Sequence, residues 1–494
     1  MSMLLSLLSA RIACRGTRLC RIFEFIFLFY CILGKNLVNL IQTPKKILAI
    51  IFGGDILKKI VSAVLLLSAV TMTFCSCYYN KNGNSTDVTQ NPTTTSSIFK
   101  TDKDDFTEYY SAIDLDFGYN NLENDNQKIV YNAMKGKSCS FTDELSENGR
   151  YLSDAIVIQK EIPEEDIFIA FTAYRYDNPG DFWLSESFSS GRSNNTTVIK
   201  LSSYYSPQEL VQKQSEFNSK VNDIISPLAG GISEYDLELY FHDYIIDNCQ
   251  YDFDAAEYVN SDELGDKYAE SFTAYGALIN GRAICQGYTE AMGYLLSCVG
   301  IESSQITGKS QEGNHIWNSV KIDGDWYQLD VTWDDTDSLS SNHDYFNITT
   351  DELEYNHSVA PVFSELSAER ITGGETNLGC SFNIFLPECN SKDSNYYVKS
   401  GAVLRDFDYE NDALIGQSLA ECAESQNEYF HIYADPDYVD FDYAVSQLFD
   451  SYIYHFQTYV DKANDILGYK CLEPSAAIVE KQRLNVITVK LTYV

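Results

Sequence analysis

The spacing of apolar residues changes near Gly300, and this change limits the folds open to the chain. Before Gly300, apolar residues recur three and four positions apart, which is typical of amphipathic helices. After it, apolar and polar residues alternate through 316–322 and again through 327–331, with Asp323-Gly324 between the two runs. An Asp-Gly pair between alternating runs is a strong hairpin signal. The order of helices followed by an antiparallel sheet predicts an α+β fold.

Four helices are predicted before the sheet, beginning at Ser206, Ser233, Ala269 and Cys285. The first has a capping serine, a proline at the first helical position and Glu209 three residues after the cap. The third is expected over Ala269–Ile279, and the fourth ends at Gly300. Upstream, the apolar run Ile167–Tyr174 is interpreted as a strand.

Cys285 is a candidate nucleophile because of its place at the start of a predicted helix. The free backbone N–H groups and the positive dipole end of a helix favour a thiolate. The same N–H groups can stabilise an oxyanion that develops during a reaction. Taken alone, however, Cys285 is better explained as a buried apolar cysteine.

The predicted hairpin supplies partners for this cysteine. If Asp323 and Gly324 form the loop, Trp317 pairs with Asp330 and His315 pairs with Thr332. His315 and Asp330 then lie on one face as diagonal neighbours about 7 Å apart, a span that an imidazole and a carboxylate can bridge. A nucleophile, a histidine and a carboxylate that orients the histidine form a Cys-His-Asp triad.

Trp317 and Trp326 share the face of His315 in this register. We predict that these two indoles bind substrate and exclude water, although core packing explains them equally well.

At these residues the chain resembles the bacterial transglutaminase-like superfamily. The Asp-Val-Thr-Trp form is similar to the branch that contains the cytokinesis and kyphoscoliosis-peptidase proteins. The segments that carry the resemblance are Gly281–Tyr288 (GRAICQGY), Gly300–Glu302, Gly308, His315–Asn318 (HIWN) and Asp323–Asp334 (DGDWYQLDVTWD). Further matches are Tyr240–Tyr244 (YFHDY), Tyr251-Asp252, 177–183, Asp344–Phe346 and His357, so the resemblance covers about residues 170–360.

The resemblance implies a papain-like core, in which a helical lobe carrying the cysteine packs on an antiparallel sheet carrying the histidine and aspartate. It assigns Cys285 as nucleophile, His315 as general base and acid, and Asp330 as the orienting carboxylate. The implied reaction is acyl transfer from an amide through a thioester. The acceptor is water in a protease or amidase and an amine in a transglutaminase. His242 is expected to be a packing residue.

No cofactor or metal is predicted. The histidines at 343, 357, 431 and 455 are not at ligand spacing, and the cysteines form no Cys-x-x-Cys pair.

The charge of the chain is divided unevenly. The net charge of −36 combines a basic segment of 76 residues, which has nine Lys/Arg and two acids, with a remainder of net charge −43. Nucleic-acid binders show a basic footprint, so we expect no nucleic-acid partner.

The basic segment contains a predicted export signal. Lys58-Lys59 precedes an apolar run too short to span a bilayer comfortably, and Phe74–Cys77 resembles a lipobox. We therefore expect Cys77 to be lipidated and the protein to lie at the extracytoplasmic face of the bacterial membrane. A plain transmembrane anchor is the alternative. Residues 1–56 are interpreted as an over-extended gene start, since Leu57 can be encoded by the start codon TTG.

These segments predict the following organisation: an over-extended start at 1–56, a lipoprotein signal peptide at 57–77, a flexible tether at 78–101, an α/β domain at 102–205, the catalytic domain at 206–360 and an acidic α/β domain at 375–494. The expected substrate is a protein or peptide, with cell-wall peptide included. Hydrolysis is favoured over transamidation because water needs no binding site. The alternative is a non-catalytic module that binds peptide or cell wall in a papain-like cleft.

Overall fold

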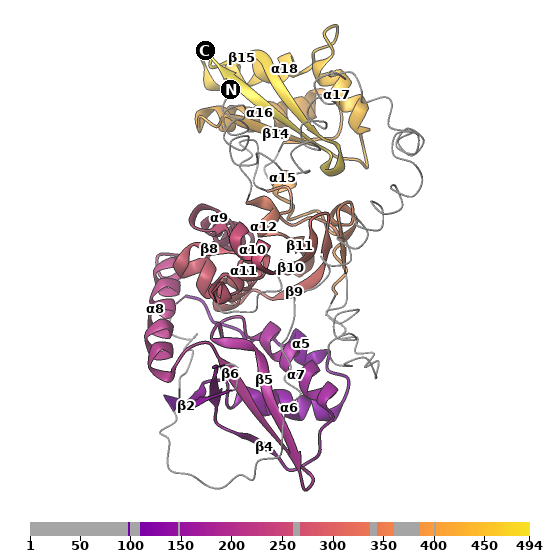
Figure 1. The fold of residues 1–494 in the computed structure, drawn as a ribbon. Coiled ribbons are helices and arrows are strands. Elements are labelled where there is room, and N and C mark those ends of the chain that lie inside the picture. The colour runs from indigo at the N-terminus through magenta and orange to yellow at the C-terminus, as the bar shows by residue number, and fades with distance from the viewer. Residues whose placement is uncertain are drawn as a thin grey trace, which may run out of the picture. The chain divides into compact units, whose positions relative to one another are not determined.

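The computed structural model describes residues 97–98, 109–146, 149–259, 267–335, 343–359, 386–399 and 402–494 (Figure 1). All of these lie in one compact unit, Thr73–Val494. Residues 1–56, the predicted signal peptide with Cys77, the predicted tether except 97–98, and residues 360–385 lie outside the described residues.

The first sheet has six strands. Strands β1, β2, β3 and β6 follow one another in the sheet, and β4 and β5 each pair with β6 as well. Its strands are β1 (Ser97–Ile98), β2 (Ser140–Leu145), β3 (Tyr151–Ser153), β4 (Ile156–Ile158), β5 (Leu184–Ser193) and β6 (Thr196–Ser203). Helices α5 (Phe117–Asn120), α6 (Asp125–Lys135) and α7 (Glu164–Asp177) gather beside this sheet (Figure 1).

The strand predicted over Ile167–Tyr174 is wrong, because this run lies inside helix α7. Eight consecutive residues of the run are buried, so the helix has no polar face there to reveal its period. Three acidic residues in its first turn, Glu164–Asp166, were the available signal for a helix start.

The helical lobe begins with α8 (Pro207–Ile225), which has the predicted capping box at Ser206 and Glu209. It continues with α9 (Glu234–Asn248), β7 (Gln250–Tyr251), α10 (Phe253–Val259), η3 (Ala269–Phe272), η4 (Gly276–Asn280), β8 (Arg282–Ala283) and α11 (Cys285–Cys298). The single helix predicted over Ala269–Ile279 is therefore two short pieces. Thr273 is extended (φ −128°, ψ 160°) and separates a 3₁₀ turn from a π turn.

The second sheet has the order β11-β10-β9-β12 and is antiparallel throughout. Its strands are β9 (Ser303–Ser310), β10 (Gly313–Ile322), β11 (Asp325–Leu329) and β12 (His357–Val359), with the short helices α12 (Val331–Asp334) and α13 (Thr350–Leu353) beside it. The hairpin register is as predicted, from Ile322 with Asp325 to Asn318 with Leu329. Asp323 and Gly324 both have positive φ, 51° and 98°, as a type I′ turn requires. Mixed helices and antiparallel sheets confirm the α+β class.

Gly308 lets two strands approach closely next to His315. It pairs with His315 on one side and with Val359 on the other. A Cβ at this position would lie 2.2 Å from the carbonyl oxygen of Ser358 and 2.6 Å from the ring of Trp317. A side chain here would therefore displace either β12 or the indole beside His315.

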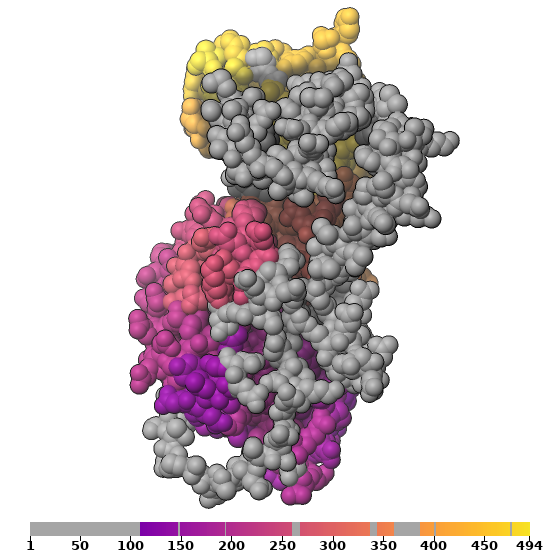
Figure 2. Space-filling view, viewed as in Figure 1, coloured from indigo at the N-terminus to yellow at the C-terminus, as the bar shows by residue number. Residues whose placement is uncertain are grey.

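The C-terminal part has a mixed sheet in the order β13-β14-β16-β15 and a hydrophobic cluster of its own. Its elements are α15 (Tyr396–Lys399), β13 (Val403–Leu404), α16 (Tyr409–Glu424), β14 (Tyr429–Ala434), α17 (Phe441–Phe449), α18 (Phe456–Leu467), β15 (Leu472–Lys481), η5 (Gln482–Leu484) and β16 (Val486–Tyr493). Its residues have the orange to yellow colours in the space-filling view (Figure 2).

None of the helices in the described ranges combines the length and apolar character needed to cross a bilayer.

Candidate active site

Cys285 is the first residue of helix α11 and is half-buried. The parallel pairing of Tyr251 in β7 with Ala283 in β8 fixes the chain just before it. The N–H of Ile284 donates to the carbonyl of Ser271 at 2.9 Å. Ile284 is the N-cap and has no side-chain acceptor, so it leaves the first-turn N–H groups of α11 uncapped. The thiol thus sits at the positive end of a helix that has 14 residues.

His315 and Asp330 form a buried pair. His315 Nε2 lies 2.6 Å from Asp330 Oδ2, and both side chains are almost wholly inaccessible to solvent. Asp330 is also the N-cap of α12, where its Oδ1 accepts from the N–H of Trp333 at 3.1 Å. The predicted pairings of Trp317 with Asp330 and of His315 with Thr332 are absent from the described sheet because β11 ends at Leu329 and the chain turns into α12. The turn brings the carboxylate to the imidazole directly.

The electrostatics of this pair favour a charged histidine. Burial opposes the charge on His315, but the negative charge and hydrogen bond of Asp330, with a hydrogen bond from Cys285, raise its pKa to about 10. Burial likewise opposes the charge on Asp330, but the two imidazoles around it hold its pKa well below the usual range. Because Nε2 of His315 faces Asp330, Nδ1 is the ring nitrogen left to contact the thiol of Cys285.

Residues 225–331, which include Cys285, His315 and Asp330, match the family model of the transglutaminase-like superfamily. The chain contains a transglutaminase-like domain. Comparison with curated proteins finds no significant match.

Two solved structures are similar to parts of the chain. One is a TGase, with 14% identity and a TM-score of 0.23 over 36% of this chain and 51% of the other. The second is a protein from Cytophaga hutchinsonii described as a candidate cysteine protease, with 11% identity and a TM-score of 0.18 over 29% of this chain and 61% of the other. The matches thus span about half and three fifths of those chains.

The two predicted substrate-binding tryptophans of the transglutaminase-like domain lie in different places. The Trp317 ring stacks on His315 with centroids 5.8 Å apart, and its Nε1 donates to Gln328 Oε1 at 2.9 Å. Only 1% of Trp317 is exposed, so its indole packs against the imidazole inside the core rather than on an accessible surface. Trp326 pairs with Lys321, six residues along β10 from His315, which corresponds to about 20 Å. The structure therefore does not bring Trp326 to the histidine.

Two residues near the site were not singled out from the sequence for a role. His357 lies fully buried with Nε2 3.2 Å from Asp330 Oδ2. Tyr251 lies near Cys285 and Asp330. Burial and then the negative charge of Cys285 raise the pKa of its phenol, so the hydroxyl remains a donor. Both positions belong to the segments that carry the family resemblance, but their spacing gave no signal of a role.

Two groups among the described residues place three ligand atoms within 4.8 Å of one another: His242, Asp243 and His343, and His315, Asp330 and His357. Sequence spacing missed the third member of each group, His343 and His357, because each is distant along the chain from the carboxylate that it contacts. In the first group, His242 contacts Asp243 at 2.9 Å and Asp334 at 3.1 Å, and His343 contacts Asp243 at 2.8 Å. These hydrogen bonds explain why the three side chains of the first group lie close together without a bound metal ion.

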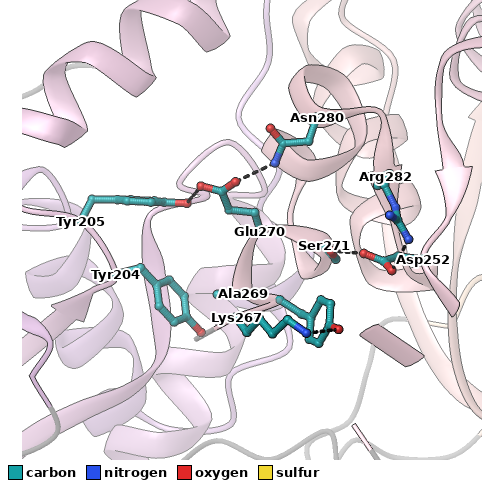
Figure 3. A pocket seen from close by; sticks show the side chains of 10 residues that line it. Tyr204, Tyr205, Asp252, Lys267, Ala269, Glu270, Ser271, Asn280 and Arg282 are labelled. Carbon is teal, nitrogen blue, oxygen red and sulfur yellow. Dashed lines mark hydrogen bonds and ion pairs between the residues drawn. The ribbon is translucent and has the colours of Figure 1, made fainter. Parts of the chain in front are cut away.

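A cavity of about 430 Å³ lies beside the segments that precede Cys285 (Figure 3). Its polar walls are paired internally: Glu270 accepts from Tyr205 at 2.8 Å and Asn280 at 2.6 Å, and Asp252 accepts from Ser271 and Arg282. Cys285, His315 and Asp330 are not among its lining residues. This network therefore holds together η3, η4 and β8, the segments that precede Cys285.

Proposed function

We propose that this protein is a cysteine enzyme that cleaves or transfers an amide acyl group, with Cys285 as nucleophile, His315 as general acid and base, and Asp330 as the orienting carboxylate. The observation that carries the proposal is the buried 2.6 Å contact of His315 with Asp330, with the other side of the imidazole facing a thiol at a helix N-terminus.

The proposed reaction starts from a Cys285 thiolate and a His315 imidazolium. The sulfur attacks the amide carbonyl and forms a C–S bond, while the first-turn N–H groups of α11 stabilise the oxyanion. His315 gives its Nδ1 proton to the departing amine as the C–N bond breaks, which leaves a thioester. Water or an amine then attacks the thioester carbonyl and gives a proton to His315. The C–S bond breaks, which regenerates the Cys285 thiolate and releases an acid or a new amide.

Hydrolysis is the proposed outcome because water needs no binding site, whereas an amine acceptor must be held in place. We propose a protein or peptide substrate, and a location at the extracytoplasmic face of the membrane through a lipid on Cys77.

Selective alkylation tests the proposed nucleophile. Burial raises the pKa of Cys139 and Cys249 to about 12 and that of Cys389 and Cys422 to about 11. At pH 6, iodoacetamide should therefore modify Cys285 well ahead of these four, as measured by peptide mass mapping over time. His315→Ala should slow that modification about tenfold or more, because the thiolate loses its counterion. Equal labelling of all accessible thiols, unchanged in the variant, would favour a binding module instead.

Amine incorporation separates the two acceptors. With a glutamine-containing peptide and a labelled primary amine, we expect release of ammonia and a glutamate product without incorporated label. Incorporation of the amine into the peptide as the main product would instead show transamidation.

A further inference from the structure

A second imidazole contacts the carboxylate that orients His315. His357 is completely buried, and its Nε2 lies 3.2 Å from Asp330 Oδ2, the same oxygen that His315 contacts at 2.6 Å. The two histidines come from strands on either side of β9, where His315 pairs with Gly308 and His357 with Ser310. The sheet therefore places two imidazoles around one carboxylate.

The contacts of His357 continue away from the site. Its Nδ1 lies 2.7 Å from Oδ1 of the Asn356 side chain, and Nδ2 of the same side chain donates to the Tyr345 hydroxyl at 2.5 Å. Tyr345, Asn356, His357 and Asp330 thus form one continuous chain of hydrogen bonds.

The direction of the hydrogen bond to Asp330 follows from charge. Asp330 is ionised and accepts only, so Nε2 of His357 must carry a proton and donate it. On the other side of the ring, Nδ1 faces the amide oxygen of Asn356, whose NH₂ group donates to the Tyr345 hydroxyl. These contacts hold the imidazole in the orientation that directs Nε2 at Asp330.

Packing leaves this arrangement little freedom. The ring of His357 has edge contacts with three aromatic rings, with centroids 4.7 Å away for Trp333, 5.3 Å for Trp317 and 5.6 Å for Tyr345. No part of the imidazole side chain is exposed to solvent. The enclosure fixes the ring and with it the direction of its Nε2–H.

We propose that His357 is a positioning residue that holds the Asp330 carboxylate in line with His315 by donating a hydrogen bond from Nε2, while Asn356 and Tyr345 hold the other side of its ring. This inference rests on the proposed role of the Cys285, His315 and Asp330 set. The Trp333 N–H fixes Oδ1 of Asp330, and His357 fixes Oδ2. The two hydrogen bonds together orient the carboxylate toward His315.

The titratable groups that face Asp330 are His315 from β10, His357 from β12, and the phenols of Tyr251 and Tyr345. Removal of the His357 donor makes the carboxylate easier to protonate, because that hydrogen bond helps to keep the pKa of Asp330 low. The charge partner of His315, and with it the ion pair with Cys285, is then lost at a higher pH than in the wild type.

The test compares His357→Phe with His357→Gln by the pH profile of Cys285 alkylation with iodoacetamide, which needs no substrate. Phe retains an aromatic ring but removes the donor, whereas the amide N–H of Gln can replace it. We expect His357→Phe to lower the alkylation rate at pH 5 about tenfold and to move the acid limb of the profile to higher pH. His357→Gln should restore most of the rate and the position of that limb.

A His357→Phe profile identical to the wild-type profile would overturn the inference, and so would an equal loss in the Phe and Gln variants. If His357→Phe does not fold, Tyr345→Phe serves as the test, since it keeps the ring and removes only the hydroxyl that orients Asn356. It should shift the acid limb in the same direction by a smaller amount, and no shift would overturn the inference. A wild-type protein whose Cys285 has no special reactivity would instead contradict the proposed function.

Discussion

Cys285→Ser should lower kcat for acyl transfer by a factor of about 10⁴ or more, because a serine hydroxyl does not ionise near neutral pH. The charged imidazole of His315 would then have no thiolate to pair with. The side chain is half-buried and nearly isosteric, so the unfolding midpoint should change little. Steady-state kinetics on a peptide amide, combined with thermal unfolding, measures both effects.

Cys422→Ser is the matched control for this substitution. Cys422 is also half-buried, but it lies on α16 in the C-terminal part and contacts the carbonyl of Tyr429. Its replacement should leave kcat within about twofold of the wild-type value. Equal activity of the two variants would contradict a nucleophilic role for Cys285.

Asp330→Asn should have the second largest effect, a loss of about 10³ to 10⁴ in kcat with little change in KM. An asparagine oxygen can still accept from the N–H of Trp333 and cap α12. Its NH₂ group, however, then faces the Nε2–H groups of His315 and His357, which have lost their acceptor. His315 is thereby driven toward the tautomer with its proton on Nδ1 and a bare Nε2.

The pH profile of the same variant gives an independent readout. Asp330 raises the pKa of His315 above its ordinary value of 6.5 to about 10, so the imidazolium is present below that pH and is lost as pH rises through it. In the wild type, kcat/KM should therefore fall on the basic side near pH 10. Asp330→Asn should move that basic limb toward pH 6.5. A basic limb that stays in place would show that Asp330 does not set the charge of His315.

Asp440→Asn is the control for the capping change. Asp440 caps α17 by accepting from the N–H of Tyr443 at 2.9 Å, in the same way that Asp330 caps α12. This substitution should leave kcat and the pH profile unchanged, since it alters a cap far along the chain from the proposed catalytic residues.

Local sequence signals predicted the hairpin and much of the helical lobe. Asp323-Gly324 set the turn and hence the register, and the Ser206 capping box set the start of α8. Both depend on residues a few positions apart, which is the range over which turn and capping chemistry acts. His315 and Asp330 could be placed together because they are two sides of one hairpin.

The errors have a common physical origin in contacts that are distant along the chain. Helix α7 is buried all round by other elements, so its sequence shows no polar face. His357 reaches Asp330 only because β12 pairs with β9 on the side opposite β10, and sequence spacing does not predict that pairing. The alternation of side chains along a strand predicted that Trp326 lies on the same face of the sheet as His315. Alternation does not give the distance between two residues along the strand.

The most direct test of the central claim is mass spectrometry of the protein quenched in acid during turnover of a glutamine-containing peptide. We predict an acyl group on the peptide that contains Cys285, which hydroxylamine removes as expected for a thioester, and none in Cys285→Ser. Turnover with no adduct at Cys285 in the wild type, or with the same adduct in the serine variant, would contradict a thioester on this cysteine and with it the proposed role of His315 and Asp330.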